Sequence, residues 1–324
     1  MYLMQRPIIS ESIINTNTKM NTIKKFLSLI VITMFVFTAC NKDKEDVNTD
    51  SKSVQQLTVD QNNVIQSSDD VMNDMDRIVS TNTLKSTQWI PCNATLDSVV
   101  NAGDTIIYYV TYHGLNCNNK IERYGNVIVK KPVNTYWIQA GATMSVQMID
   151  LEITRVATGK MLIINGKKVF ENVSGGHIAL LGSVYTSIVH RTSGYLNATF
   201  EDNTTRTWFI ARQKVFTGVL GDLIMTVDGF GVDSGYENLS VWGTDRQGEA
   251  FFTNISQSIV FKEACNFNPV SGIQEHTLPA VNKSASITYG YDASQQLITN
   301  GDCPTHYRID FQHGTYSGTL YLPL

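Results

Sequence analysis

Residues 195–212 read YLNATFEDNTTRTWFIAR, and this stretch decides the fold. Apolar and polar side chains mostly alternate over Tyr195–Glu201 and again over Arg206–Arg212, as in strands that bury one face. Asp202 and Asn203, which lie between the two runs, are residue types that favour turns. The stretch therefore predicts a β-hairpin.

The same alternation extends to both sides of this hairpin from Trp89 onward. Asn165-Gly166 predicts a tight hairpin turn between Met161–Ile164 and Lys167–Phe170, because a type I′ turn needs positive φ at both central residues. Asp245–Gly248 predicts another hairpin. We expect further strands over Met144–Thr154, Ala179–Val189, Leu223–Val227, Leu239–Gly243, Ala250–Asn254 and Ser258–Lys262.

These signals predict a mainly β fold, a long antiparallel meander that forms a curved sheet or a sandwich over residues 85–324. No helical pattern separates the strands, which argues against βαβ units. A transmembrane barrel is the alternative, but charged and Asn residues interrupt the apolar outward bands that it needs.

A single amphipathic helix is expected at 59–84, near one end of the sheet. Its acidic residues are interpreted as a solvated face rather than a metal site. The apolar residues at helical spacing are Val64, Val71, Met75, Ile78 and Val79, and the acidic ones are Asp69, Asp70, Asp74 and Asp76.

The N-terminal segment 1–39 has the order of regions found in a secretory signal, with Lys24 and Lys25 before the apolar run Phe26–Phe37. The run is too short to span a bilayer. Its end, Phe37-Thr38-Ala39-Cys40, resembles the lipobox of bacterial lipoproteins, with Phe in place of the usual Leu. The resemblance implies cleavage after Ala39 and lipid on Cys40, hence a membrane partner through this anchor. Met20 is the expected translation start.

Residues 40–58 are interpreted as a lipidated flexible tether, since they are rich in Asn, Asp, Ser, Lys and Gln. The charged run 42–46 within it resembles the export tag that sends Bacteroidota lipoproteins to the cell surface. A solvated tether is the alternative interpretation of that run.

Four cysteines remain once Cys40 is assigned to lipid, and spacing alone does not choose among their three possible pairings. The two ends of the β region, near 92–130 and 265–322, share one plan: cysteine, Tyr-rich strand, turn, cysteine, strand. We therefore expect the bridges Cys92–Cys117 and Cys265–Cys303 in two related end modules. A chance likeness between Tyr-rich strands is the alternative.

Composition and motifs exclude several functions. The net charge of −4 and the lack of a basic block in the mature chain exclude nucleic acid as a partner. No metal site is expected, because no C-x-x-C or H-x-x-x-H occurs, and the six histidines are scattered. No G-x-S-x-G elbow or phosphate loop is present, so we expect neither an enzyme nor a cofactor.

The chain also resembles a family of uncharacterised Bacteroidota envelope lipoproteins. The segments that carry the likeness are 90–92, 206–208, 242–248, 259–262 leading to Cys265, and 300–303. The resemblance implies the location, a lipid anchor in the outer membrane with surface exposure as one possibility, and the fold, but no activity.

We expect a non-enzymatic envelope or surface module for binding, adhesion or structure, in which a broad sheet face binds glycan, a protein partner or host matrix. The candidate contact residues are Tyr136, Trp137, Trp208, Tyr236 and Trp242, which offer large apolar area with a polar handle, although core packing is an alternative for most. A carrier of lipid or another apolar ligand, with a cavity in a curled sheet, is the second hypothesis, and a hydrolase the third. Ser98 and Thr105 resemble Bacteroidota O-glycosylation sites.

Overall fold

The computed structural model describes residues 42–81 and 90–324, with side chains of the helix described from Lys52 to Val79. Residues 47–324 form one compact unit. The elements are α1 (Lys42–Thr81), β1 (Ala94–Ala102), β2 (Thr105–Leu115), β3 (Ile121–Pro132), β4 (Ala142–Arg155), β5 (Lys160–Asn172), η1 (Ile178–Leu180), β6 (Ile188–Phe200), β7 (Thr205–Val219), β8 (Asp222–Gly229), β9 (Gly231–Asp233), β10 (Tyr236–Thr244), β11 (Ala250–Lys262), η2 (Glu263–Cys265), β12 (Asn268–Leu278), η3 (Pro279–Val281), β13 (Lys283–Tyr291), β14 (His306–His313) and β15 (Tyr316–Pro323).

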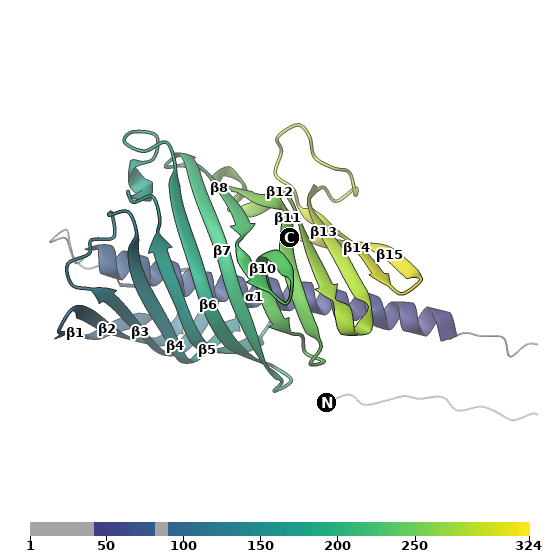
Figure 1. Cartoon of the computed structure of the whole chain (residues 1–324), viewed down its shortest axis with the longest axis horizontal. Helices are drawn as coiled ribbons and strands as arrows, with labels where there is room; N and C mark the ends of the chain where they lie inside the picture. Colours follow the sequence, from purple (N-terminus) through teal and green to yellow (C-terminus); the bar gives the residue numbers. More distant parts are fainter. Residues whose placement is uncertain (1–41, 82–89) are drawn as a thin grey trace, which may run out of the picture. The chain divides into compact units, whose positions relative to one another are not determined.

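The fold is the predicted antiparallel meander, with fifteen strands in one sheet of the described chain. Strands β1 to β7 pair in sequence order, β10 follows β7, and the order then continues to β15 (Figure 1). The expected hairpin at 195–212 is confirmed, because β6 pairs with β7 across the turn at 201–204.

A small closed barrel of four strands interrupts this order. β8 pairs with both β7 and β11, and β10 pairs with the same two strands. β7 and β11 are long enough, at 15 and 13 residues, for each to pair with one partner along its first half and the other along its second half. Strands β8 and β9 therefore leave the main path, and β10 becomes the neighbour of β7.

The helix α1 packs on one face of the sheet, which we call the inner face; the opposite face is the outer face (Figure 1). Val64, Val71 and Met75 are completely buried in a core that they share with inner-face residues such as Leu151 and Ile164. The helix begins at Lys42, so it includes most of the range 40–58 that was expected to be a flexible tether. Its last described residue is Thr81.

Acidic residues of α1 form ion pairs with the inner face, and the interpretation of a solvated acidic face was wrong for them. Asp74 accepts hydrogen bonds from Arg123 at 2.9 Å and from the Tyr112 hydroxyl at 2.8 Å. Asp69 accepts from Lys168 at 2.6 Å and from Lys214 at 2.7 Å. The sequence pattern could not show this, because the cations come from strands at least 49 residues away along the chain.

The hairpin predicted at Asn165-Gly166 was wrong, because both residues lie inside the continuous strand β5. The Asn165 amide instead exchanges hydrogen bonds with Asp150, at an irregularity in the pairing of β4 with β5. Gly166 is required for a different reason: a Cβ there would collide with the backbone oxygen of Tyr195 in β6. The Asn-Gly pair thus allows a close approach between strands and does not form a turn.

The strand expected over Ala179–Val189 was also wrong. Residues 178–180 form the short helix η1, and β6 begins only at Ile188. The His177 ring accepts a hydrogen bond from the Ala179 amide and so caps η1. The two strands expected over 250–254 and 258–262 are a single strand, β11, with an irregular register in its middle.

The disulfides join Cys92 to Cys117 and Cys265 to Cys303, the two pairs expected from the shared plan of the ends. In each case the first cysteine precedes a strand pair, β1–β2 or β12–β13, and the second follows it. The disulfides indicate an oxidising, extracellular or periplasmic location.

In the part of the chain that the structure describes, no helix has the length and apolar character to cross a membrane. The expected signal peptide, the start at Met20 and the lipidation site Cys40 lie outside the described residues.

Candidate functional site

The five aromatic residues expected to contact a ligand lie in different environments. Trp208 is fully buried and donates its indole N–H to the Thr244 oxygen at 2.7 Å, so it belongs to the core. Trp137 is also buried, packed on Phe170 and His190. Tyr136 is exposed in the segment between β3 and β4. Trp242 and Tyr236 both belong to β10. Three further aromatic residues, Tyr195, Phe209 and Phe252, lie beside them on neighbouring strands and were not predicted from the sequence.

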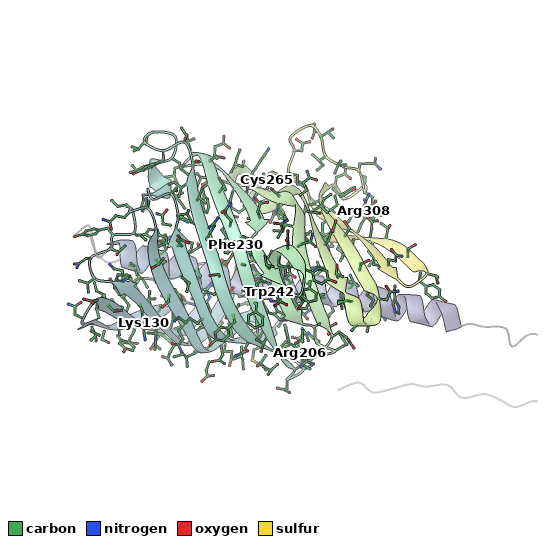
Figure 2. All side chains as sticks on the ribbon, in the orientation of Figure 1. Lys130, Arg206, Phe230, Trp242, Cys265 and Arg308 are labelled. Atoms are coloured by element: carbon green, nitrogen blue, oxygen red, sulfur yellow. A yellow bond between two sulfur atoms is a disulfide. The ribbon has the colours of Figure 1, made fainter. Side chains whose placement is uncertain are left out.

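A cross-strand row of four aromatic residues runs over the middle of the outer face. The register places Tyr195 of β6 opposite Phe209 of β7, Phe209 opposite Trp242 of β10, and Trp242 opposite Phe252 of β11. Their sequence neighbours, such as Leu196, Trp208 and Phe251, are buried on the inner side, which directs the row outward. We call Tyr195, Phe209, Trp242 and Phe252 the aromatic row; Trp242 is labelled in Figure 2.

Two residues of the row are substantially exposed. Tyr195 and Phe209 are 44% and 43% exposed, high values for aromatic residues in the centre of a sheet. The rings of Phe209 and Trp242 are nearly parallel, 21° apart, with centroids at 5.7 Å. Tyr236 stacks on Phe252 at 4.3 Å and covers it, so that Tyr236 presents the outer ring at this end.

Glycine 231 in β9 fixes the position of the Trp242 ring. A Cβ at this position would lie 2.6 Å from the indole carbon Cζ3. The indole therefore rests directly on the backbone of β9, in space that only glycine leaves open.

Neutral polar groups border the aromatic row. Two residues along from Tyr195 and Phe209, on the same face, the Thr207 hydroxyl donates to the Asn197 side-chain oxygen at 2.7 Å, and Asn197 pairs with Asn165. Lys167 is the charged residue that pairs directly with Tyr195. Exposed rings with amides and hydroxyls beside them match a ligand with apolar C–H patches and many hydroxyl groups.

The ion pairs under α1 are the second candidate site. Burial opposes the ionisation of Asp69, but the nearby Lys168, Lys214 and Arg212 outweigh it and hold the pKa of this carboxyl below its usual value. Lys168 is fully buried, and burial lowers its pKa although Asp69 opposes this. These groups satisfy one another, so they join the helix to the sheet and offer no open site.

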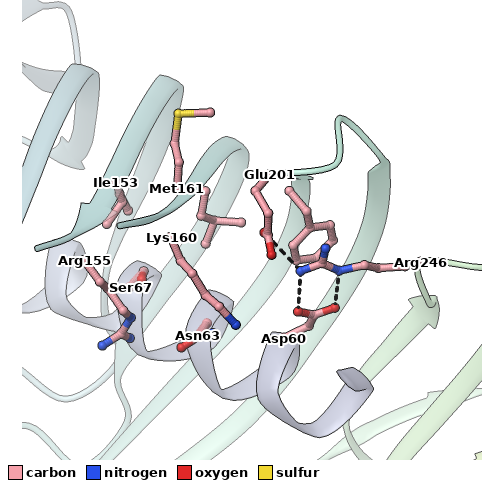
Figure 3. A pocket seen from close by; sticks show the side chains of 11 residues that line it. Asp60, Asn63, Ser67, Ile153, Arg155, Lys160, Met161, Glu201 and Arg246 are labelled. Carbon is pink, nitrogen blue, oxygen red and sulfur yellow. Dashed lines mark hydrogen bonds and ion pairs between the residues drawn. The ribbon is translucent and has the colours of Figure 1, made fainter. Parts of the chain in front are cut away.

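A narrow pocket lies between α1 and the ends of β4, β5 and β6 (Figure 3). Arg246 closes one side of it with a bidentate pair to Asp60, at 2.6 and 2.8 Å, and a further contact to Glu201 at 3.2 Å. The remaining space is about 20 Å³, enough for one or two water molecules. This pocket is too small for a lipid.

No metal site is found among residues 52–79 and 90–324. No cluster of three His, Cys, Asp or Glu side chains in this part could hold a metal ion. Two histidines are deeply buried: burial lowers the pKa of His276 to about 3, and burial together with Lys214 lowers that of His190 to about 3. Such imidazoles are neutral and are held in the core.

The two expected glycosylation positions lie at one end of the sheet. Ser98 is exposed in β1, next to a bulge, and Thr105 is half-buried at the start of β2. Both positions lie in strands of the sheet.

No protein-family model, curated protein or solved structure matches the chain. Membership of the Bacteroidota envelope lipoproteins therefore stays a prediction.

Proposed function

We propose that this chain is a non-enzymatic binding module of the cell envelope and that its aromatic row binds glycan. The observation that carries the proposal is the register that places Tyr195, Phe209 and Trp242 side by side on the outer face. Rings exposed on a rigid sheet lose little conformational entropy on binding, because the backbone and the neighbouring rings already fix their positions.

The location follows from two further features. The disulfides suit an oxidising compartment. The lipobox-like Cys40 would anchor the protein to the outer membrane through lipid, with the binding face carried by the domain. Metabolic labelling with a palmitate analogue tests the anchor, with label expected on the wild type and lost in Cys40→Ala.

Glycan binding is tested with the full chain against a panel of polysaccharides: cellulose, starch, chitin, peptidoglycan and mucin. We expect retardation in affinity electrophoresis by at least one of these, and loss of that retardation in the double variant Phe209→Ala/Trp242→Ala. Tyr124→Ala is the matched control, since Tyr124 is similarly exposed, at 47%, in β3.

Two results would contradict the proposal. One is the absence of retardation by the whole panel, and the other is equal retardation of the wild type and the double variant. The carrier hypothesis predicts a different result, an apolar ligand retained by the purified protein in native mass spectrometry.

A further inference from the structure

The aromatic row continues beyond Phe252 as a row of polar side chains. Phe252 pairs with Thr277 of β12, Thr277 with Ser284 of β13, Ser284 with Gln312 of β14, and Gln312 with Ser317 of β15. These four residues are the polar row. Because β-sheet register is continuous, the aromatic and polar rows form one line across eight strands, from β6 to β15.

The polar row lies in a shallow depression. The depression encloses about 460 Å³ and is lined by all four residues of the polar row, together with Glu275 and Asp310. Most of its lining side chains point to the outer face, because the residues that alternate with them, Ala285 and Phe311, are buried in the core under the sheet. The depression lies over β12–β15, the last strands in Figure 1.

The chemistry of the depression differs from that of the aromatic row. Its walls carry hydroxyls, one amide and two carboxylates, which together donate and accept hydrogen bonds. Asp310 already forms an ion pair with Arg308 at 2.7 Å and accepts a hydrogen bond from the Thr319 hydroxyl at 2.7 Å, so its charge is neutralised locally. A ligand that suits both rows has an apolar ring face at one end and many hydroxyls along its length.

We propose that the ligand is a linear, uncharged oligosaccharide that lies across the strands, with one part on the aromatic row and the next part in the depression. This inference rests on the proposed glycan-binding function and specifies its substrate class. Seven strand intervals of ~4.8 Å each make a site of roughly 34 Å, far longer than one or two sugar rings. A terminal sugar or a disaccharide would reach only one of the two rows.

The experiment measures affinity against chain length by isothermal titration calorimetry. The probes are the cello-, malto- and laminari-oligosaccharide series, from disaccharide to octasaccharide. We expect the affinity to rise roughly tenfold or more between the disaccharide and the longest member of one series, equal to about 1.4 kcal/mol.

Two variants locate this gain. Ser284→Ala/Gln312→Ala should abolish most of the gain with length and leave disaccharide binding unchanged, because the disaccharide occupies the aromatic row. Phe209→Ala should weaken every member of the series. Tyr124→Ala should change neither, and equal thermal unfolding temperatures establish that the variants are folded.

The outcomes separate the inference from the function on which it rests. If the affinity does not depend on oligosaccharide length but is still lost in Phe209→Ala, the extended site is wrong and glycan binding by the aromatic row stands. A length-dependent gain unaffected by Ser284→Ala/Gln312→Ala would also overturn it. Absence of binding by all three series and by the polysaccharide panel would overturn both.

Discussion

Phe209 and Trp242 lie on neighbouring strands with ring centroids 5.7 Å apart, although β8 and β9 separate them in the sequence. They are neighbours because β8 leaves the main sheet to pair with the far ends of β7 and β11. The small closed barrel thus joins two aromatic pairs, Tyr195–Phe209 and Trp242–Phe252, into one row.

The position of Trp242 depends on Gly231. A methyl group at residue 231 would lie 2.6 Å from the indole carbon Cζ3 and 2.9 Å from the Leu239 backbone oxygen, so Gly231→Ala must displace the ring, together with the pairing of β9 and β10 beneath it. We expect this variant to weaken glycan binding roughly tenfold, or about 1.4 kcal/mol, although it removes no aromatic residue. The measurement is a titration beside the wild type, with Val232→Ala as control, since Val232 is the next residue of β9 and its side chain is exposed. Unchanged affinity in Gly231→Ala would contradict the role given to Trp242.

Arg246 joins α1 to two hairpins through Asp60, Glu201 and Asp202. Arg246→Ala leaves the buried Asp60 carboxylate without its bidentate partner, so we expect a loss of about 3–5 kcal/mol in the free energy of unfolding. Urea denaturation measures this loss. In a double-mutant cycle, the free energy of unfolding lost in Asp60→Asn/Arg246→Ala should be smaller than the sum of the losses in the two single variants. Additive losses would show that the pair is not coupled.

Asp69 neutralises three cations of the inner face, whereas Asp70 pairs with Arg123 at 3.5 Å and is more exposed. Asp69→Asn should therefore destabilise the protein by about 3–5 kcal/mol, because Lys168 is left buried without a carboxylate. Asp70→Asn, the control next to it on α1, should cost less than about 1 kcal/mol. Equal unfolding midpoints in urea for the two variants would contradict this assignment.

The buried histidines predict a dependence of stability on pH. In the folded state the pKa of His190 and of His276 lies at about 3, against an ordinary value of 6.5. Between these values the unfolded chain binds more protons, so stability is fully present above about pH 6.5 and falls as the pH is lowered toward 3. Each histidine contributes a slope of up to about 1.4 kcal/mol per pH unit.

Urea unfolding at several pH values from about 7.5 to 5 measures the slope. His190→Gln and His276→Gln should each reduce it, and His113→Gln, at an exposed position, should leave it unchanged. A slope that is the same in all three variants would show that other groups govern the acid sensitivity.

The fold class was predictable because most strands bury one face, and the alternation of side chains records this directly. The row was predictable in part. Residues at equal distances from Asp202 pair, which places Tyr195 opposite Phe209, and residues at equal distances from Gln247 pair, which places Trp242 opposite Phe252. The pairing of β7 with β10 depends on the tertiary position of β8, which no local pattern contains.

Other sequence predictions were wrong because tertiary contacts, which no local pattern contains, decide the structure at those residues. Asn165-Gly166 has the residues of a tight turn, but the close approach of β6 uses the same lack of a Cβ. Trp208 is as aromatic as Trp242, and only the side of the strand on which each lies decides which of them packs in the core. Trp137 lies between β3 and β4, and its burial depends on tertiary contacts with Phe170 and His190. The partners of Asp69 and Asp74 are set by where α1 crosses the sheet, which composition does not show.

The most direct test of the central claim is a titration that observes the indole N–H signals of the four tryptophans by NMR, assigned with Trp242→Phe and the corresponding single variants. The titrants are the mixed gluco-oligosaccharides and, separately, a lysophospholipid. Glycan binding on the aromatic row predicts that the oligosaccharides shift the Trp242 signal and leave those of the buried Trp137 and Trp208 unchanged, while the lipid shifts none. Shifts at Trp137 or Trp208 with lipid, and none at Trp242 with oligosaccharide, would contradict it and favour a carrier that opens under α1.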